Sequence, residues 1–119
     1  MKKENSIQVK SYAFALRVVR MYRREYKNSD VKSLLRQVLD SSTSIGANVE
    51  EAEGGQSKRD FIAKMNISYK EARETRFWLR ILRDAEVLKT DEANSLISDC
   101  EELLRFLTAI LNTSKGSNS

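Results

Sequence analysis

The side chains in this sequence that could do chemistry are few, and most of them are carboxylates. The 119 residues include no histidine, which excludes Ser-His-Asp and Cys-His catalysis, most zinc sites and the Glu-x-x-His motif of di-iron bundles. Cys100 is the single cysteine, so no internal disulfide can form, and this fits a reducing compartment. Gly54 and Gly55 lack the following Lys-Ser/Thr of a phosphate-binding loop. These features argue against an enzyme.

Two groups of acids remain as candidates for a metal site or for acid–base catalysis. Glu50 and Glu53 can share one face of a helix and hold Mg²⁺ or Ca²⁺, whereas Glu51 points elsewhere. Glu71 and Glu74 lie one helical turn apart and form a possible acid–base pair. For the first group the simpler interpretation is a solvated helix end, and for the second it is pairing with Arg or Lys on the same or a neighbouring helix. We therefore expect no catalytic residue, no metal and no cofactor.

The elements that position these side chains are predicted to be helices. The chain has no proline and is rich in Leu, Ala, Glu, Lys and Arg, a composition typical of long helices. Its length indicates one domain over residues 1–119. Four amphipathic helices with short loops predict an all-α, antiparallel up-and-down four-helix bundle. The predicted helices span residues 6–27, 31–53, 58–88 and 91–112, and the polar tail 113–119 is expected to be disordered.

The stretch SIGANVEEAEGGQSKRDF, residues 44–61, joins the second and third helices. Gly46 inside a helix costs on the order of 1 kcal/mol against alanine, so close packing of a neighbouring helix is expected there. Asn48 is a candidate for a hydrogen bond across that interface. Gly54-Gly55 predicts a left-handed C-cap, and Ser57, three residues before an aspartate, predicts the next N-cap.

Apolar residues form two stripes on each of the first and third helices, which is more than one bundle needs. On the first helix, the stripe assigned to the core contains Tyr12, Leu16, Val19, Tyr22 and Tyr26. Surplus apolar stripes usually mark an interface and therefore predict a homo-oligomer. The predicted subunit interface consists of Phe14, Val18, Met21, Ile67, Trp78 and Ile81.

Charge alternates along the chain, and the first and third helices are basic. Residues 1–27 carry eight Lys or Arg against two acids, and residues 54–90 carry nine against five. On each of these helices the basic residues fall within a sector of roughly 80–100°. Such stripes indicate either solvated faces paired with acids of the second and fourth helices, or phosphate contacts with RNA or DNA. The candidate phosphate-contacting residues are Lys10, Arg17, Arg20, Arg24, Arg73, Arg76, Arg80 and Arg83.

The segment 44–82 carries a family resemblance in its SIGAN, QSKRDF and KEARETRFWLR motifs. It closely resembles the core of the four-helix-bundle family of 23S rRNA intervening-sequence proteins, and the similarity covers nearly the whole chain. Gly46 stands where the commonest form of the motif has a proline. The resemblance implies a homopentameric ring and distant kinship to the accessory variability determinant of diversity-generating retroelements, whose partners include nucleic acid and a reverse transcriptase. The family supplies no catalytic residues.

Two functional hypotheses follow. The first is a non-enzymatic, oligomeric bundle that binds RNA or DNA through its basic helices without reading sequence. Tyr22, Tyr26 and Trp78 are then candidates for base stacking, although their spacing favours packing in a core or interface. The second is a protein-interaction scaffold with no nucleic-acid role. No apolar run is long enough to cross a membrane, and the N-terminus lacks the apolar region of a signal peptide, so a cytoplasmic location is expected.

Overall fold

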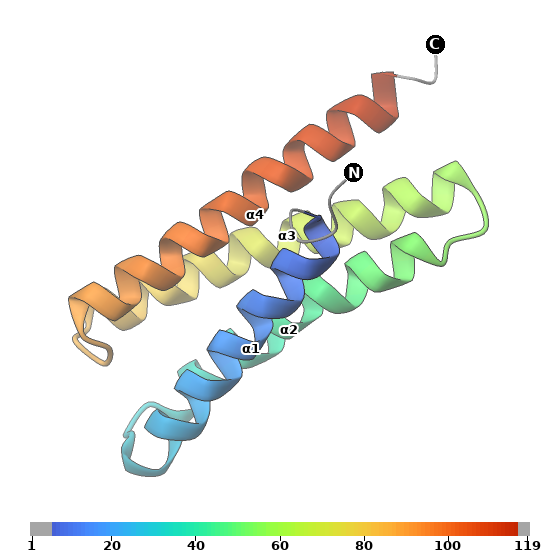
Figure 1. The fold of residues 1–119 in the computed structure, drawn as a ribbon. Coiled ribbons are helices and arrows are strands. Elements are labelled where there is room, and N and C mark those ends of the chain that lie inside the picture. The colour runs from blue at the N-terminus through green and yellow to red at the C-terminus, as the bar shows by residue number, and fades with distance from the viewer. Residues whose placement is uncertain (1–5, 117–119) are drawn as a thin grey trace.

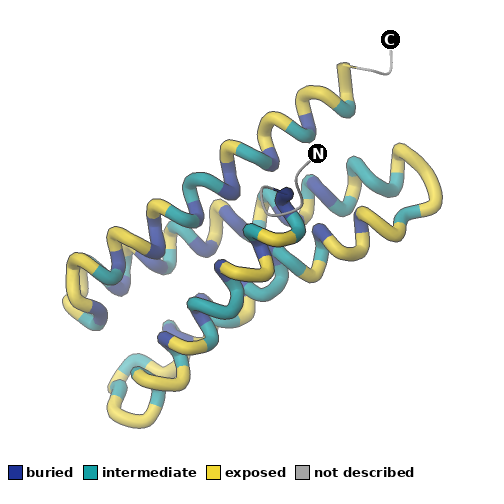
Figure 2. The backbone as a smooth tube through the Cα atoms, in the orientation of Figure 1, coloured by how far each residue is buried: buried dark blue, intermediate teal, exposed yellow. Residues whose placement is uncertain are grey.

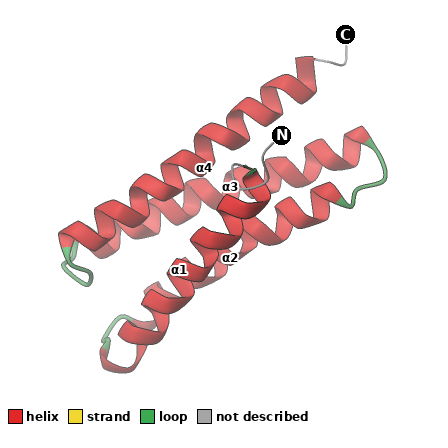
Figure 3. Ribbon diagram, viewed as in Figure 1, coloured by secondary structure: helices red, strands yellow, loops and turns green. Residues whose placement is uncertain are grey.

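The computed structural model describes residues 6–116 and confirms the all-α four-helix bundle (Figures 1 and 3). Its helices are α1 (Ile7–Glu25), α2 (Lys32–Glu53), α3 (Lys58–Asp84) and α4 (Thr90–Gly116), and a short 3₁₀ helix, η2 (Tyr26–Asn28), follows α1. No strand occurs within this described range. None of the helices in it is long and apolar enough to span a membrane. The bundle measures 51 × 23 × 22 Å.

The helices pack in cyclic order, and α1 and α4 make the least extensive contact of the four neighbouring pairs. α1 has 19 residues, whereas α3 and α4 have 27 each. At a rise of about 1.5 Å per residue, α1 is therefore only about 29 Å long, whereas its neighbour α4 is about 40 Å long. The α1–α4 seam is thus the loosest part of the bundle.

Buried positions recur along each helix of the bundle (Figure 2). On α1, the residues that are buried differ from those predicted to face the core. Phe14, Val18 and Met21, predicted to form a subunit interface, are 0–2% exposed and belong to the core of a single chain. Tyr12, predicted to be in the core, is 69% exposed. Both stripes have helical spacing, so periodicity does not decide which of them faces the other three helices. The buried trio therefore cannot form a surface between subunits.

Small and polar residues allow α2 and α3 to pack closely. The Thr75 hydroxyl lies 2.8 Å from the Ser41 hydroxyl and 2.8 Å from the Glu71 carbonyl oxygen, and both hydroxyls are buried. Ser68 donates a hydrogen bond of 2.9 Å to the Ile45 carbonyl oxygen. These contacts satisfy buried polar groups between the helices.

The structure changes two details of the 44–61 stretch. Gly46 does approach another helix, but a Cβ placed there would lie 3.5 Å from the Ser11 hydroxyl oxygen, an ordinary contact. Asn48, expected to bond across the interface, donates instead to the Ser44 carbonyl oxygen of its own helix at 2.9 Å.

The turns also differ from the sequence-based expectations. Gly54 has φ −90° rather than a left-handed conformation. A Cβ at Gly55 would lie 2.7 Å from an Asp60 carboxylate oxygen, which can move aside, and 3.0 Å from the backbone carbonyl oxygen of Ala52, which has less freedom to move. The predicted N-cap is confirmed, because the Ser57 hydroxyl accepts a hydrogen bond of 3.0 Å from the Asp60 N–H.

The last two helix ends were predicted incorrectly. α3 ends at Asp84 rather than at residue 88. Just after this end, Glu86 has φ 61°, and the Val87 N–H donates a hydrogen bond of 2.9 Å to the Leu82 carbonyl oxygen. Together with the bond from Glu86 N–H to the Arg83 carbonyl oxygen, this is a Schellman C-cap formed without glycine. α4 continues to Gly116, so residues 113–116 are helical rather than disordered, and 117–119 lie outside the described residues.

Candidate nucleic-acid interface

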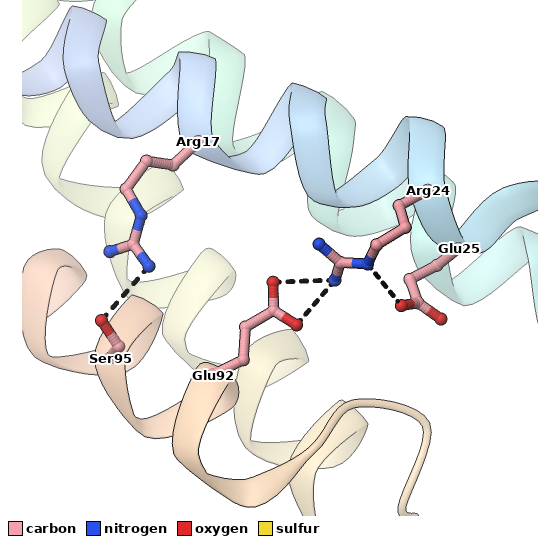
Figure 4. A network of polar contacts seen from close by, with 5 residues as sticks. All are labelled: Arg17, Arg24, Glu25, Glu92 and Ser95. Carbon is pink, nitrogen blue, oxygen red and sulfur yellow. Dashed lines mark hydrogen bonds and ion pairs between the residues drawn. The ribbon is translucent and has the colours of Figure 1, made fainter.

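Two arginines of the predicted stripe on α1 are paired with α4 (Figure 4). Arg24 Nη2 donates to both carboxylate oxygens of Glu92 at 2.6 and 2.7 Å. Arg17 pairs with Asp99 and also donates to the Ser95 hydroxyl at 3.2 Å. The hydrogen bond to Glu92, followed by one to Glu25, raises the pKa of Arg24 above its usual value. These guanidinium groups are therefore held by carboxylates of their own chain.

Lys10 extends the same seam toward the start of α1. Its ammonium lies 3.3 Å from a Glu102 carboxylate oxygen and 5.4 Å from the centre of the Phe106 ring. Arg20 lines the neighbouring cavity of about 320 Å³, is exposed, and has no ion pair within residues 6–116. Lys10, Arg17 and Arg24 thus form ion pairs within the chain, as the solvated-face interpretation predicted. Of the four predicted residues on α1, only Arg20 forms none within residues 6–116.

The stripe on α3 is less occupied. Arg83 donates to Asp84 at 2.9 Å and to the Asn94 side-chain oxygen at 3.0 Å. The hydrogen bond from Arg83 is the main cause of the lowered pKa of Asp84. Arg76 reaches Glu101 of α4 only at 4.0 Å. Half of this stripe therefore has weak or local partners.

The other two arginines of the predicted stripe on α3 are exposed and form no ion pair with a carboxylate in the described part of the chain. Arg73 lies over the ring of Tyr69, with its guanidinium carbon 6.0 Å from the ring centre. Arg80 lines a surface cavity of about 390 Å³ together with Phe77, Ile81, Asp84 and Ala85. Arg73 and Arg80 are seven residues apart, so they lie on the same side of α3, two turns from each other.

Arg105 of α4 adds a cation beside this stripe. It is exposed and lines an open groove of about 630 Å³ between α3 and α4, together with Arg76, Glu101, Thr108 and Asn112. The sequence analysis missed it because the last quarter of the chain has net negative charge. Its position four residues after Glu101, on the turn facing the basic stripe of α3, is the signal that would have found it.

Phe77 is an aromatic residue that the sequence analysis also missed. It is 51% exposed, and its ring meets that of Trp78 edge-on at 5.1 Å. Of the aromatic residues that were considered, Trp78 is half-buried and its ring N–H donates to Glu74 at 3.1 Å. The ring centres of Tyr22 and Tyr26 lie 4.9 Å apart, and both side chains are half-buried. Phe77 is thus the most open aromatic side chain of α3.

The three remaining residues of the predicted subunit interface lie on the outer part of α3. Ile67 is 40% exposed, while Trp78 and Ile81 are half-buried. Phe77, Trp78 and Ile81 form a short apolar strip beside Arg80, whereas Ile67 lies about 15 Å further toward the start of α3.

Burial raises the pKa values of both Glu71 and Cys100. Partial burial, with a smaller effect of Glu74, raises the pKa of Glu71. Burial raises the pKa of the Cys100 thiol to about 12, and Cys100 donates to the Ala72 carbonyl oxygen at 3.2 Å. Among the residues from 6 to 116, no three acids or cysteines gather into a possible metal site.

Comparison with known proteins identifies the family. The sequence profile of the 23S rRNA-intervening sequence protein family matches residues 3–109. The chain belongs to this family. A solved structure with the same fold is a protein of unknown function from the S23 ribosomal protein family of Bacteroides thetaiotaomicron. It is 39% identical, has a TM-score of 0.86, and aligns over 89% of this chain and 98% of its own. A search of curated proteins gave no match.

Seven of the eight basic residues predicted to contact phosphate fall into two groups, and Arg20 belongs to neither. Lys10, Arg17 and Arg24 close the loose α1–α4 seam. The arginines of α3 lie on a face with an exposed aromatic ring and with Arg105 nearby. The second group is the better candidate for an external polyanion, because fewer of its charges are neutralised within the chain.

Proposed function

We propose that this protein is a non-enzymatic helical-bundle protein that binds RNA or DNA through the outer face of α3. The observation that supports this most directly is that Arg73 and Arg80 are exposed on one side of α3 without a carboxylate partner in residues 6–116. α3 as a whole carries eight Lys or Arg against four Asp or Glu. Contacts of this kind hold the phosphate backbone and carry no sequence information.

The proposal narrows the set of contacting residues predicted from the sequence. Arg73 and Arg80 are the principal contacts, with Arg76, Arg83 and Arg105 beside them and Arg20 as a separate contribution from α1. Lys10, Arg17 and Arg24 are assigned to the α1–α4 seam, because an external phosphate would have to displace a carboxylate from each of them. We further propose that the protein acts in the cytoplasm as a homo-oligomer, a pentamer by analogy with its relatives, which would repeat the α3 face.

A protein-interaction scaffold without a nucleic-acid role is the second candidate. Two observations favour it: the ion pairs that use the α1 stripe internally, and the apolar strip of Phe77, Trp78 and Ile81 on α3. In that case the strip would meet another protein or another copy. The arginines beside it would then pair with acids of that partner.

The test is a binding titration with a structured RNA and a duplex DNA, with the particle mass followed by light scattering. If four arginines of one chain contact phosphate, affinity should fall roughly 10²-fold between 50 and 200 mM salt. Binding with this steep salt dependence, and similar for unrelated sequences, is the expected result. A particle of constant mass that takes up neither polymer at low salt would overturn the proposal and favour the scaffold.

A further inference from the structure

Phe77 is placed to contact a ligand rather than the core. About half of its surface is open to solvent although it lies in the middle of a well-formed helix. Arg73 precedes it by four residues and Arg80 follows it by three, so the two arginines lie one turn to either side of the ring on the same face of α3. Single exposed apolar side chains are ordinary on protein surfaces, and what distinguishes Phe77 is the arginine on either side of its ring.

The carboxylates nearest to the ring have partners of their own. Asp84, which lines the cavity of about 390 Å³ beside Phe77, is bonded to Arg83 at 2.9 Å. Glu74 accepts the hydrogen bond from the Trp78 ring at 3.1 Å. Arg73 and Arg80 have no ion pair with either acid. Arg80 acts on Asp84 only through space, as the smallest cause of the lowered pKa of that carboxyl, so both guanidinium groups can still hydrogen-bond an anion that approaches Phe77.

We infer that this face binds single-stranded nucleic acid, with a base stacked on Phe77 and the adjoining phosphates on Arg73 and Arg80. The inference rests on the proposed function and names its substrate class. Exposed aromatic rings within a basic surface are how sequence-tolerant single-strand binders hold bases. In a duplex the bases are already stacked and paired, so the ring gains little from duplex and much from an unpaired strand.

The charges also favour this ligand over an apolar partner. An apolar partner packed on Phe77 would remove Arg73 and Arg80 from water without supplying an anion, and burying unpaired charges is strongly unfavourable. A polyanion supplies phosphates on both sides of the ring at once. Arg73 and Arg80 are about 10.5 Å apart along the helix axis, which leaves room for a base between the two arginines.

The test compares Phe77→Ala with the wild type on a 20-mer oligo(dT), a 20-mer oligo(U) and a hairpin duplex, by fluorescence anisotropy at one salt concentration. Phe77→Tyr keeps the ring, and Tyr12→Ala removes a still more exposed aromatic side chain from α1 as a control. The wild type should bind both single strands more tightly than the hairpin. Phe77→Ala should weaken single-strand binding by roughly 5- to 150-fold, the range expected when one stacked base loses its ring. Hairpin binding should stay within about twofold, and Phe77→Tyr and Tyr12→Ala should resemble the wild type.

Circular dichroism establishes that each variant folds. If single strands and hairpin bind equally and Phe77→Ala changes neither, the inference is wrong while the proposed function stands. If none of the three probes binds, the proposed function fails and the inference with it. If Phe77→Ala lowers the particle mass and leaves oligonucleotide affinity unchanged, a second copy covers Phe77 and the inference is overturned.

Discussion

Removing the Thr75 hydroxyl should destabilise the bundle more than removing its Ser41 partner. Thr75 Oγ1 lies 2.8 Å from both the Ser41 hydroxyl oxygen and the Glu71 carbonyl oxygen. Among residues 6–116, the Ser41 hydroxyl has one other hydrogen-bond partner, the Val38 carbonyl oxygen, and that bond is long at 3.5 Å. Both residues are buried: the exposed fraction is 0% for Thr75 and 2% for Ser41. Thr75→Val keeps the shape of the side chain but leaves Ser41 with no good partner.

The expected energies follow from that asymmetry. Thr75→Val should cost about 1–3 kcal/mol, because a buried hydroxyl is left unsatisfied. Ser41→Ala should cost only about 0.5–1.5 kcal/mol, since Thr75 keeps its bond to Glu71. Removing both hydroxyls leaves no orphaned group, so the double variant should lose less than the sum of the two, with a coupling of about 1 kcal/mol or more.

Urea unfolding followed by circular dichroism measures these differences, with all four proteins at the same concentration so that any oligomerisation is held constant. The slope of the unfolding free energy with urea should be unchanged across the set. Strict additivity of the two single variants would refute this explanation of the contact, as would a Thr75→Val cost below that of Ser41→Ala.

Three further predictions concern local features. Glu86→Gly should stabilise the bundle by about 1 kcal/mol in the same assay, because Glu86 has φ 61°, whereas Glu86→Ala should give no such gain. Gly46→Ala should raise the unfolding free energy by up to about 1 kcal/mol, since the new methyl meets Ser11 only at 3.5 Å; a loss of stability instead would indicate that the space is not available. The Cys100 thiol should resist a disulfide reagent at pH 8 until the protein is unfolded, and rapid labelling of the folded protein would contradict its burial. Because its pKa is raised from 9.0 to about 12 on folding, Cys100 should lower stability only as the pH rises above 9.

The sequence predicted the number, type and order of the helices because their apolar spacing and the glycine turn are local signals. It did not predict which stripe of the first helix is buried, since Tyr12 and Phe14 both belong to helical repeats. Only the positions of the other three helices decide that. The end of α3 was missed for a related reason: its Schellman cap uses Glu86, a residue without the turn preference of glycine.

The candidate site was predicted in part. The basic stripes were found from helical spacing, but spacing does not show which arginines have partners in space. Arg24 meets Glu92, which is 68 residues away, and Arg17 meets Asp99, which is 82 residues away. Phe77 was not predicted as a site residue, because the sequence alone does not show whether a phenylalanine on a helix is exposed or buried.

The most direct test of the proposed function compares two double variants that change the net charge equally. Arg73→Gln with Arg80→Gln removes two open cations of α3, and Arg17→Gln with Arg24→Gln removes two that are paired with α4. Affinity for a mixed-sequence single strand is measured for both over a range of salt. We predict that the α3 pair weakens binding on all sequences and reduces the slope of log K against log salt by roughly 1.4, because two arginines no longer neutralise phosphates, while the α1 pair stays near the wild type. Equal loss of affinity in both variants would show that only total charge matters, and it would contradict the assignment of the interface to α3.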